Sequence, residues 1–274
     1  MINEEIKEKL KEAQLEIYDE LKRICVKNGI EFYACSGTAI GAAREHDFIP
    51  WDIDIDIMML RPEYDRFKEC CKKDLDDHFE YFDYTVLHNY TRPHAVLAMK
   101  GTSLKNRFDK FNKNSMDLGI YIDIMALDNM SNDPEERIRQ FNKIRKLKKA
   151  KARALHTYYN GSMIRHLVKY IISIPYRFIS IDRYNEMMDK EMRRYDDQET
   201  DYIMNFGGLY SYDRELMKRS WIGTPFEERF GKRTMPQIEG YDEYLTNEYG
   251  DYMTPPPMEE RREGYFDEVK FRDD

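Results

Sequence analysis

Between Ile49 and Ile57, aspartates alternate with isoleucines. Because a strand has a side-chain period of two, the isoleucines would share one face, and Asp52, Asp54 and Asp56 the other. Three carboxylates on one strand face repel one another, and their burial without a partner is costly. A divalent cation would remove this conflict, and Asp-x-Asp on a strand commonly holds Mg²⁺ against a phosphate. The alternative is an edge strand with a solvated acidic face.

A turn suited to phosphate precedes this run. Residues 31–35 predict a short apolar strand, and Ser36-Gly37-Thr38 follows it at the start of a predicted helix. Glycine lets the backbone approach a ligand, and free helix N–H groups favour anions. Arg44, two turns along that helix, can offer its guanidinium to an anion. The turn alone is a weak indication, but a turn that leads into an Asp-x-Asp strand is more specific.

These two motifs together resemble the LicD family of phosphotransferases. Downstream segments are similar to other family motifs: 119–128 to a later strand, and 226–227, 241–245 and 249–257 to the C-terminal signature. The resemblance runs over about residues 30 to 130 and 225 to 257. Two positions depart from the family pattern: Ile53 replaces a further acid, and Met125-Ala126 replaces Phe-Pro.

The resemblance implies a nucleotidyltransferase-like fold of mixed α+β class, with helices packed on a mixed sheet. It implies an enzyme that uses Mg²⁺ (or Mn²⁺) and a CDP-linked small-molecule donor. The expected reaction transfers a phospho-alcohol group, foremost phosphocholine from CDP-choline, to a hydroxyl of a cell-surface glycan or its lipid-linked precursor. Teichoic acid and lipopolysaccharide are glycans of this kind. Choline, ethanolamine, ribitol and glycerol stay open as the transferred alcohol.

Three sets of site residues follow from the motifs. The catalytic and metal-binding carboxylates are expected to be Asp54, Asp56 and Asp123, with Asp123 as a metal ligand or as base for the attacking hydroxyl. Contacts to the donor phosphates are expected from Ser36, Gly37, Thr38, Gly41, Arg44 and Lys100. Substrate contacts are expected from Trp51, Asp52, Tyr249, Asp251 and Tyr252, because aromatic faces attract quaternary ammonium groups.

Structural alternatives stand beside these roles. Asp123 could be a buried, hydrogen-bonded acid, Asp52 could orient its neighbours, and most aromatic residues could be core. Among six histidines, only His46, which lies between two motifs, stands out as a residue to test.

Composition excludes some classes of protein. The 274 residues carry a net charge of −8, which disfavours a general nucleic-acid binder. The chain opens with a charged segment rather than a signal peptide, and it has no apolar run of about 18 residues. Four cysteines without Cys-x-x-Cys spacing predict thiols in a packed core and a reduced, cytoplasmic setting, with the inner membrane face as a further option. The sequence makes no prediction about the oligomeric state.

The chain divides into three predicted parts. The catalytic core, 1–133, opens with a helix over 3–28 that Asn28-Gly29 ends. It continues with a helix over 61–73, strands over 81–86, 95–99 and 119–125, and a loop at 112–114. The part 134–200 is helical, with helices over 135–156, 162–179 and 182–194. The part 201–274 is rich in Tyr and Pro and is expected to complete the active site, with a peripheral tail after Glu259.

The helical part carries a basic run over 143–153. One interpretation is a solvated helix face; the other is contact with an anionic surface, either lipid headgroups or a glycan phosphate. The isoleucines over 164–174 are expected to pack in a core, although an apolar and basic stretch also suits a membrane surface.

Two other functions compete with the phosphotransferase. A nucleotidyltransferase that modifies a small acceptor such as an antibiotic would use the same turn and Asp-x-Asp, and a non-catalytic binding protein could retain a relict site. The Tyr-Gly-Asp-Tyr signature at 249–252 favours the phosphotransferase, and the intact carboxylates disfavour the relict site.

Overall fold

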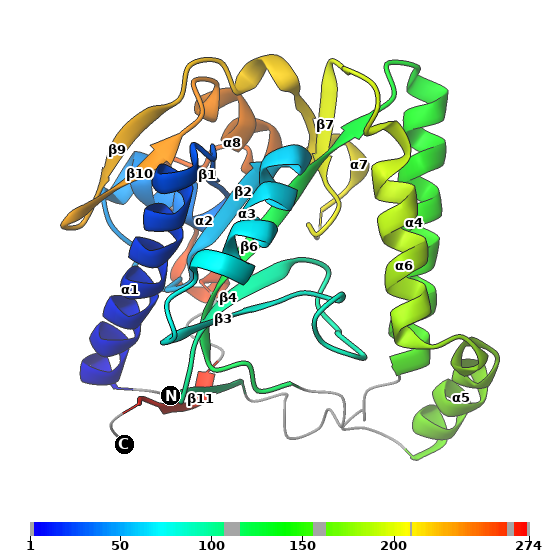
Figure 1. Ribbon diagram of the computed structural model, residues 1–274. Helices are drawn as coiled ribbons and strands as arrows, with labels where there is room; N and C mark the ends of the chain where they lie inside the picture. The colour runs from blue at the N-terminus through cyan, green and yellow to red at the C-terminus, as the bar shows by residue number, and fades with distance from the viewer. Residues whose placement is uncertain (1–2, 107–115, 156–162, 209, 262–265, 273–274) are drawn as a thin grey trace.

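The computed structural model describes residues 3–106, 116–155, 163–208, 210–261 and 266–272. Among these, the main sheet has seven strands and is mixed, which confirms the α+β class. The strands of this sheet are β1 (Tyr33–Ala34), β2 (Asp56–Leu60), β3 (Phe79–Phe82), β4 (Ala95–Met99), β6 (Ile120–Met130), β7 (Tyr202–Asn205) and β8 (Leu216–Lys218). Figure 1 shows them as a twisted layer in the middle of the molecule.

The long strand β6 organises the sheet. On one side it pairs in parallel with β2, which in turn pairs with β1. On its other side two antiparallel strands follow one another: β4 along Ile120–Ile124 and β7 along Leu127–Met130. Met125 and Ala126 therefore lie at a gap between the start of β4 and the end of β7. The sheet is open at this point.

Helices α1 (Glu4–Asn28) and α3 (Arg61–Asp74) cover one face of the sheet (Figure 1). Both agree with the sequence prediction. The Asn3 side chain caps α1 by accepting a hydrogen bond from the Ile6 N–H at 2.8 Å. Gly29 ends the helix with φ of +60°, a conformation that costs glycine little. From Leu10 to Ile24 the apolar stripe of α1 is buried in the core, while Ile6 in its first turn is half-buried.

On the opposite face, a short helical segment follows β1. It consists of α2 (Ser36–Ile40) and the π-helical turn η1 (Gly41–Glu45). The C-terminal helix α8 (Tyr241–Tyr249) packs against α2. The acidic side of β2 faces this pair of helices.

A helical layer stands at one end of the sheet. In Figure 1, α4 (Pro134–Leu155) and α6 (Ile181–Met192) run side by side next to β7. They share a small core with the sheet that includes Met130, Ile144, Met188 and Met204. Figure 1 shows α5 (Met163–Ser173) beyond the lower end of α4 and α6, away from the sheet; it continues as the 3-10 helix η3 (Ile174–Phe178). A further 3-10 turn, η4 (Arg193–Tyr195), follows α6.

The last part of the chain adds strands that the sequence did not predict. Hairpin β9 (Phe226–Phe230) and β10 (Arg233–Gln237) packs beside α1, and the Tyr18 hydroxyl donates to the Thr234 carbonyl at 2.6 Å. Strand β11 (Phe266–Lys270) pairs with β5 (Ser103–Asn106), so the tail after Glu259 contributes a strand. The short elements α7 (Tyr212–Glu215), η5 (Arg219–Trp221) and η6 (Met258–Glu260) connect these pieces.

Several predicted boundaries were wrong for identifiable reasons. The strand predicted over 81–86 ends at Phe82, because the Asp83 carboxylate accepts the N–H groups of Thr85 and Val86 and closes a turn. The strand predicted over 119–125 continues to Met130, because β7 supplies a partner for its second half. The helix predicted over 162–179 narrows to a 3-10 turn at Ile174, where Pro175 lacks an N–H. The loop predicted at 112–114 lies outside the described residues.

The prediction that the isoleucines over 164–174 pack in a core was wrong for Ile171, Ile172 and Ile174, and the side chain of Ile164 lies outside the described part of the structure. Ile171 is 55% exposed, Ile172 50% and Ile174 43%. Among the described residues, all four cysteines are free thiols, and all but the half-buried Cys70 are buried, in agreement with core packing. Within the described part of the chain, none of the helices combines the length and the apolar character needed to cross a bilayer. The division into three domains stays a prediction.

Candidate active site

The largest cavity beside the acidic strand opens at the gap between β4 and β7. Its volume is about 610 Å³. Predicted site residues that line it are Ser36, Gly37, Arg44, Trp51, Asp52, Asp54, Asp56, Asp123, Tyr249, Asp251 and Tyr252. The structure therefore brings residues from the two ends of the chain to one concave site.

The alternation of Asp and Ile persists through the site, although hydrogen-bonded strand β2 begins only at Asp56. Ile53, Ile55 and Ile57 are buried in the core, while the aspartates between them face the cavity. The Asp56 N–H donates to the Thr38 hydroxyl at 2.8 Å, and this bond ties the acidic segment to α2. Thr38 thus supports the site from beneath rather than lining it.

The carboxyl groups crowd one another. Burial, and then the negative charge of Asp56, raises the pKa of Asp54 well above its usual range. Burial and the charge of Asp123 do the same for Asp56, whose residue lies opposite Asp123 in the β2–β6 register. The side chains of Asp52 and Asp54 approach within hydrogen-bonding distance, a contact that two ionised carboxylates cannot make without a proton or a cation.

Asp123 differs from the other two. Its Oδ1 accepts from Arg92 at 2.8 Å and lies 3.0 Å from His94 Nε2. Although burial alone would raise the pKa of Asp123, His94 and Arg92 hold it below its usual range. Among the described residues, no three Asp, Glu, His or Cys side chains already form a metal-binding group. The structure thus places the three predicted carboxylates on one cavity wall but pairs Asp123 with cations of its own.

The charge of the cavity is strongly unbalanced. Six acidic residues line it: Asp52, Asp54, Asp56, Asp123, Glu248 and Asp251. The basic groups among its lining residues are Arg44 and His94. The Arg44 guanidinium is itself engaged by Glu45 at 2.8 Å and by the Tyr252 carbonyl. A polyphosphate therefore meets mainly negative charge here unless cations accompany it.

The Ser36 turn is held by the C-terminal helix. Ser36 has φ of +49°, which is unusual outside glycine, and its N–H donates to the Tyr244 hydroxyl at 3.0 Å. The Tyr244 and Tyr249 hydroxyls hydrogen-bond in turn to Glu248, and burial raises the pKa of that carboxyl to about 7. The conformation of the predicted phosphate-binding turn thus depends on α8.

Glycine is required at two points of this turn. A Cβ at Gly37 would lie 2.6 Å from Asp52 Oδ2, so the absence of a side chain lets the acidic segment cross the turn. A Cβ at Gly41 would lie 2.5 Å from the Asp47 carbonyl oxygen, and Gly41 does not line the cavity. Its role here is close packing of backbone against backbone.

Two other predicted or highlighted residues lie outside the cavity. Lys100 follows the end of β4 that is farthest from His94, and its N–H donates to the His78 carbonyl. His46 is half-exposed, and its Nδ1 lies 3.1 Å from the Ala42 carbonyl oxygen. Neither is positioned to contact a ligand in the cavity.

Aromatic residues surround the acidic wall. The Arg261 guanidinium lies 4.3 Å from the centre of the Trp51 ring, so this ring already receives a cation. Tyr249 packs edge-on against Tyr210, a lining residue that the sequence did not reveal. Tyr252 donates its hydroxyl to Asp242 at 2.7 Å.

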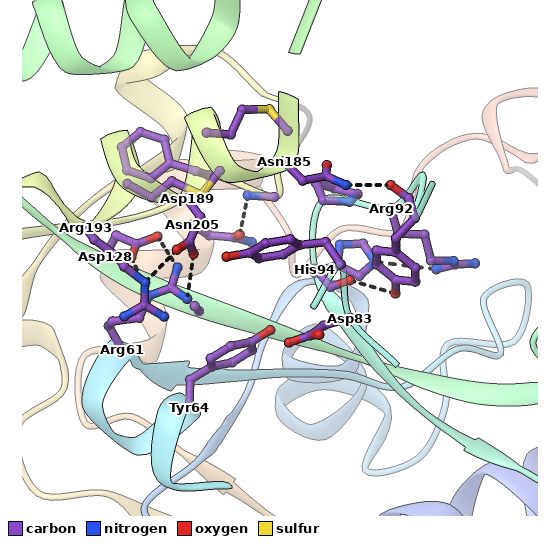
Figure 2. A pocket seen from close by; sticks show the side chains of 18 of the residues that line it. Arg61, Tyr64, Asp83, Arg92, His94, Asp128, Asn185, Asp189, Arg193 and Asn205 are labelled. Carbon is purple, nitrogen blue, oxygen red and sulfur yellow. Dashed lines mark hydrogen bonds and ion pairs between the residues drawn. The ribbon is translucent and has the colours of Figure 1, made fainter. Parts of the chain in front are cut away.

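A second, smaller cavity of about 60 Å³ lies among α3, β6 and α6 and shares Pro93, His94, Asn205 and Gly207 with the first. Figure 2 shows its two sides, with Arg61, Asp128 and Asp189 grouped on one and Arg92 and His94 on the other. Its cations are paired: Arg61 with Asp128 at 2.6 and 2.8 Å, Lys68 with Asp83 at 2.7 Å, and Arg193 with Asp189 at 2.9 Å. Its lining holds four Lys or Arg and three Asp residues, so in contrast to the larger cavity it is not acidic.

Arg92, His94 and Glu248 were not predicted from the sequence as site residues. Arg92 and His94 precede β4 and reach Asp123 only because β4 pairs with β6. Glu248 lies inside a helix without a motif of its own. The one available signal was proximity along the chain: Glu248 directly precedes the Tyr249 signature.

Comparison with known proteins agrees with this geometry. Residues 29–146 match the family described as LicD/FKTN/FKRP, nucleotidyltransferase domain. The chain is also 27% identical over 275 residues to the lipopolysaccharide cholinephosphotransferase LicD of Haemophilus influenzae, an alignment that covers 95% of this chain and 97% of that protein. The family match contains the Ser36 turn, the acidic segment and Asp123, and the alignment extends over the helical and C-terminal parts. The chain is therefore similar to the LicD phosphotransferases over nearly its whole length, with the nucleotidyltransferase domain of that family at residues 29–146.

Proposed function

We propose that the chain transfers phosphocholine from CDP-choline to a hydroxyl of a cell-surface glycan or its lipid-linked precursor, with Mg²⁺ or Mn²⁺ as cofactor. The observation that carries the proposal is the charge imbalance of the large cavity. Six carboxyl groups line the cavity, and the cations near them are the engaged Arg44, His94, and Arg92, which pairs with Asp123 from outside the cavity lining. Such a site suits a divalent cation together with a positively charged alcohol, and it disfavours a bare polyphosphate.

The residues fit a hard divalent cation. Asp54 and Asp56 provide carboxylate oxygens, and within the described residues neither has an ion-pair partner among Lys, Arg and His. They would hold the ion, which when bound supplies charge neutralisation at the donor phosphates. The hydrogen-bonding approach of Asp52 and Asp54 is the kind of contact that such an ion relieves.

The protein's own groups would position the reactants. Asp123 is held at Oδ1 by Arg92 and His94, and a carboxylate whose pKa is kept low is a poor base. Of the two roles predicted for Asp123, metal ligand and base for the attacking hydroxyl, the low pKa supports the first over the second. Ser36 and Gly37, held in place by α8, lie where the donor phosphates would approach.

The lining also bears on the transferred alcohol. Choline and ethanolamine are cations, whereas ribitol and glycerol are neutral, and acidic and aromatic side chains select for a cation. Trp51, Tyr210 and Tyr249 provide ring faces and edges beside Glu248 and Asp251. The similar protein from Haemophilus influenzae is named for lipopolysaccharide as acceptor, and we extend a glycan acceptor of this kind, with a cytoplasmic location at or near the membrane, to this chain.

A product assay tests the proposal. The chain is incubated with CDP-choline, Mg²⁺ and a lipopolysaccharide or teichoic acid acceptor, with CDP-glycerol as the neutral donor control. We expect CMP release and phosphocholine on the acceptor, with turnover at least about 100-fold lower in Asp54→Asn and Asp56→Asn. The control variant Asp197→Asn, an exposed acid away from the cavity, should retain wild-type turnover.

The competing function gives a different product. A nucleotidyltransferase would attach CMP to a small acceptor and release a different leaving group, so mass spectrometry of the acceptor separates the two reactions. Turnover that survives in Asp54→Asn, or that is unchanged by removal of divalent cations, would contradict the proposed use of the site.

A further inference from the structure

Exposed apolar side chains concentrate on one segment far from the active site. Among the described residues, eight of fifteen exposed large hydrophobic side chains fall within 167–179, on α5 and η3. They are Leu167, Val168, Tyr170, Ile171, Ile172, Ile174, Phe178 and Ile179. Phe178 is 86% exposed and Leu167 58%. Contiguous exposed apolar surface of this kind marks a contact with a partner or a membrane.

Positive charge is concentrated around the same segment. Residues 137–181 contain twelve Lys or Arg and no Asp or Glu, in a chain whose net charge is −8. Along α4, exposed Lys143, Lys146, Lys149 and Arg153 recur at helical spacing on one side. They line a groove together with Pro175 and Ile179, so the basic side of α4 lies directly beside the end of the apolar segment, and α4 also contacts α5.

Part of this charge is free of local partners. Lys143 pairs with Glu191 at 2.6 Å, but in the described chain neither Lys146 nor Lys149 has an ion-pair partner. Lys148 and Lys151 point the other way: their amines donate to the Phe206 carbonyl and to Asn185, at 2.7 and 2.6 Å. The helix thus uses some lysines for packing and leaves others facing outward beside the apolar segment.

We propose that α5, η3 and the outward side of α4 form a docking surface for an anionic phospholipid membrane. We name the set Lys143, Lys146, Lys149, Arg153 and 167–179 the basic–apolar face. An exposed apolar helix flanked by Lys and Arg lies in the interfacial plane with its apolar residues among the acyl chains and its charges near anionic headgroups. At eleven residues, α5 is too short to span a bilayer.

The charge pattern selects this occupant over a second copy of the chain. In a two-fold symmetric dimer the same face meets itself, so outward lysines would confront outward lysines. A membrane rich in anionic lipid complements both parts of the face, because its headgroups carry the charge opposite to the lysines and its acyl chains accept the apolar side chains. The proposal does not depend on the reaction catalysed, and binding can be measured without turnover.

Vesicle flotation of the full chain tests the surface. Phosphatidylcholine vesicles with and without phosphatidylglycerol are the probes, each at low and high salt. We expect binding to the anionic vesicles only, weakened by salt because headgroup contacts are screened. The apolar variant Leu167→Ser/Phe178→Ser and the charge variant Lys146→Glu/Lys149→Glu should each bind at least about tenfold more weakly.

Two control variants carry the same kinds of substitution at exposed positions outside the basic–apolar face. Val26→Ser/Met258→Ser alters exposed apolar residues, and Lys218→Glu/Lys232→Glu alters exposed lysines, all outside the basic–apolar face. Both should bind like wild type, and far-UV circular dichroism checks that every variant is folded. Because the two test variants differ in chemistry, misfolding of one leaves the other decisive.

Three results would overturn the proposal. The first is no binding of wild type to anionic vesicles. The second is equal loss of binding in the control variants. The third is a wild-type dimer, measured by light scattering, that the apolar variant converts to monomer, since the face would then be covered by a second copy.

Discussion

At the scale of single residues, the site is defined by how each carboxyl group is compensated. Asp123 has Arg92 and His94, whereas the charged groups with the largest effect on Asp54 are the acids Asp56, Asp52 and Asp123. The pKa of Asp123 is accordingly held low and the pKa of Asp54 is raised. The two aspartates therefore differ: the charge of Asp123 is compensated by cationic side chains of the protein, whereas Asp54 would need a bound cation.

The uncompensated charge predicts a gain of stability in Asp54→Asn. Without divalent cations, the variant should unfold at a higher urea concentration than wild type, by on the order of 1 kcal/mol, since a repulsive buried charge is removed. Mg²⁺ should raise the melting temperature of wild type and leave that of the variant unchanged. A matching Mg²⁺ response in both proteins would count against Asp54 as a ligand.

Glu248 predicts a pH-dependent stability. Its folded-state pKa is about 7 against a usual 4.5, so the stabilising protonated form is fully present below pH 4.5 and is lost as the pH rises through 7. Glu248→Gln can still accept a tyrosine hydrogen bond and removes this loss. The free energy of unfolding of Glu248→Gln minus that of wild type should be larger at pH 8 than at pH 5, by up to about 3 kcal/mol. Urea titrations at both pH values measure this, and an identical difference at each would contradict it.

At the scale of elements, the segment of α2 and η1 is shaped by backbone contact. Gly37 admits a side-chain oxygen of Asp52, whereas Gly41 admits a backbone carbonyl of Asp47. Side chains can rotate away from a new methyl group, but a backbone carbonyl moves only with its whole segment. The two glycines therefore have different tolerances although they lie on one short helical stretch.

This contrast yields a prediction. Gly41→Ala should destabilise the protein by about 1–3 kcal/mol, because its Cβ would overlap the Asp47 carbonyl. Gly37→Ala should change stability less, since the Asp52 side chain can rotate and alanine favours a helix, but it should lower turnover by displacing Asp52 from Asp54. Chemical denaturation and the transferase assay separate the two effects; equal destabilisation by both variants would be inconsistent with this account.

At the scale of the whole molecule, the C-terminal part of the chain completes the sheet and the cavity that the N-terminal part begins. Strand β7 pairs with the second half of β6, and Tyr244 in α8 holds the Ser36 turn. Leu245, Met204 and Ile203 are fully buried. The site accordingly lies where segments separated by more than a hundred residues meet (Figure 1).

A chain ended at residue 200 should therefore fail to fold cooperatively. It would lack β7 and α8 and would leave Leu127–Met130 of β6 without their partner strand. We expect no cooperative thermal transition and strong binding of a hydrophobic dye, whereas the full chain should show coincident transitions by near- and far-UV circular dichroism. A sharp transition in the shortened chain would show that the first two parts form an independent domain.

What the sequence determined by itself is local. The Gly29 end of α1, the Asp/Ile alternation and the glycine turn follow from side-chain period and backbone freedom within a few residues, and each was predicted before the fold was known. The alternation and the turn predicted the acidic side of the cavity wall and, with the later motifs, showed the resemblance to the LicD family.

Only the tertiary structure decided which distant groups reach that wall. Arg92 and His94 meet Asp123 through strand pairing, and Tyr244 of α8 meets the Ser36 turn through helix packing. The apolar residues of α5 remain exposed because, among the described residues, no other element covers them. Strand pairing and helix packing depend on segments that are far apart in the sequence, so a pattern within a few consecutive residues does not predict them.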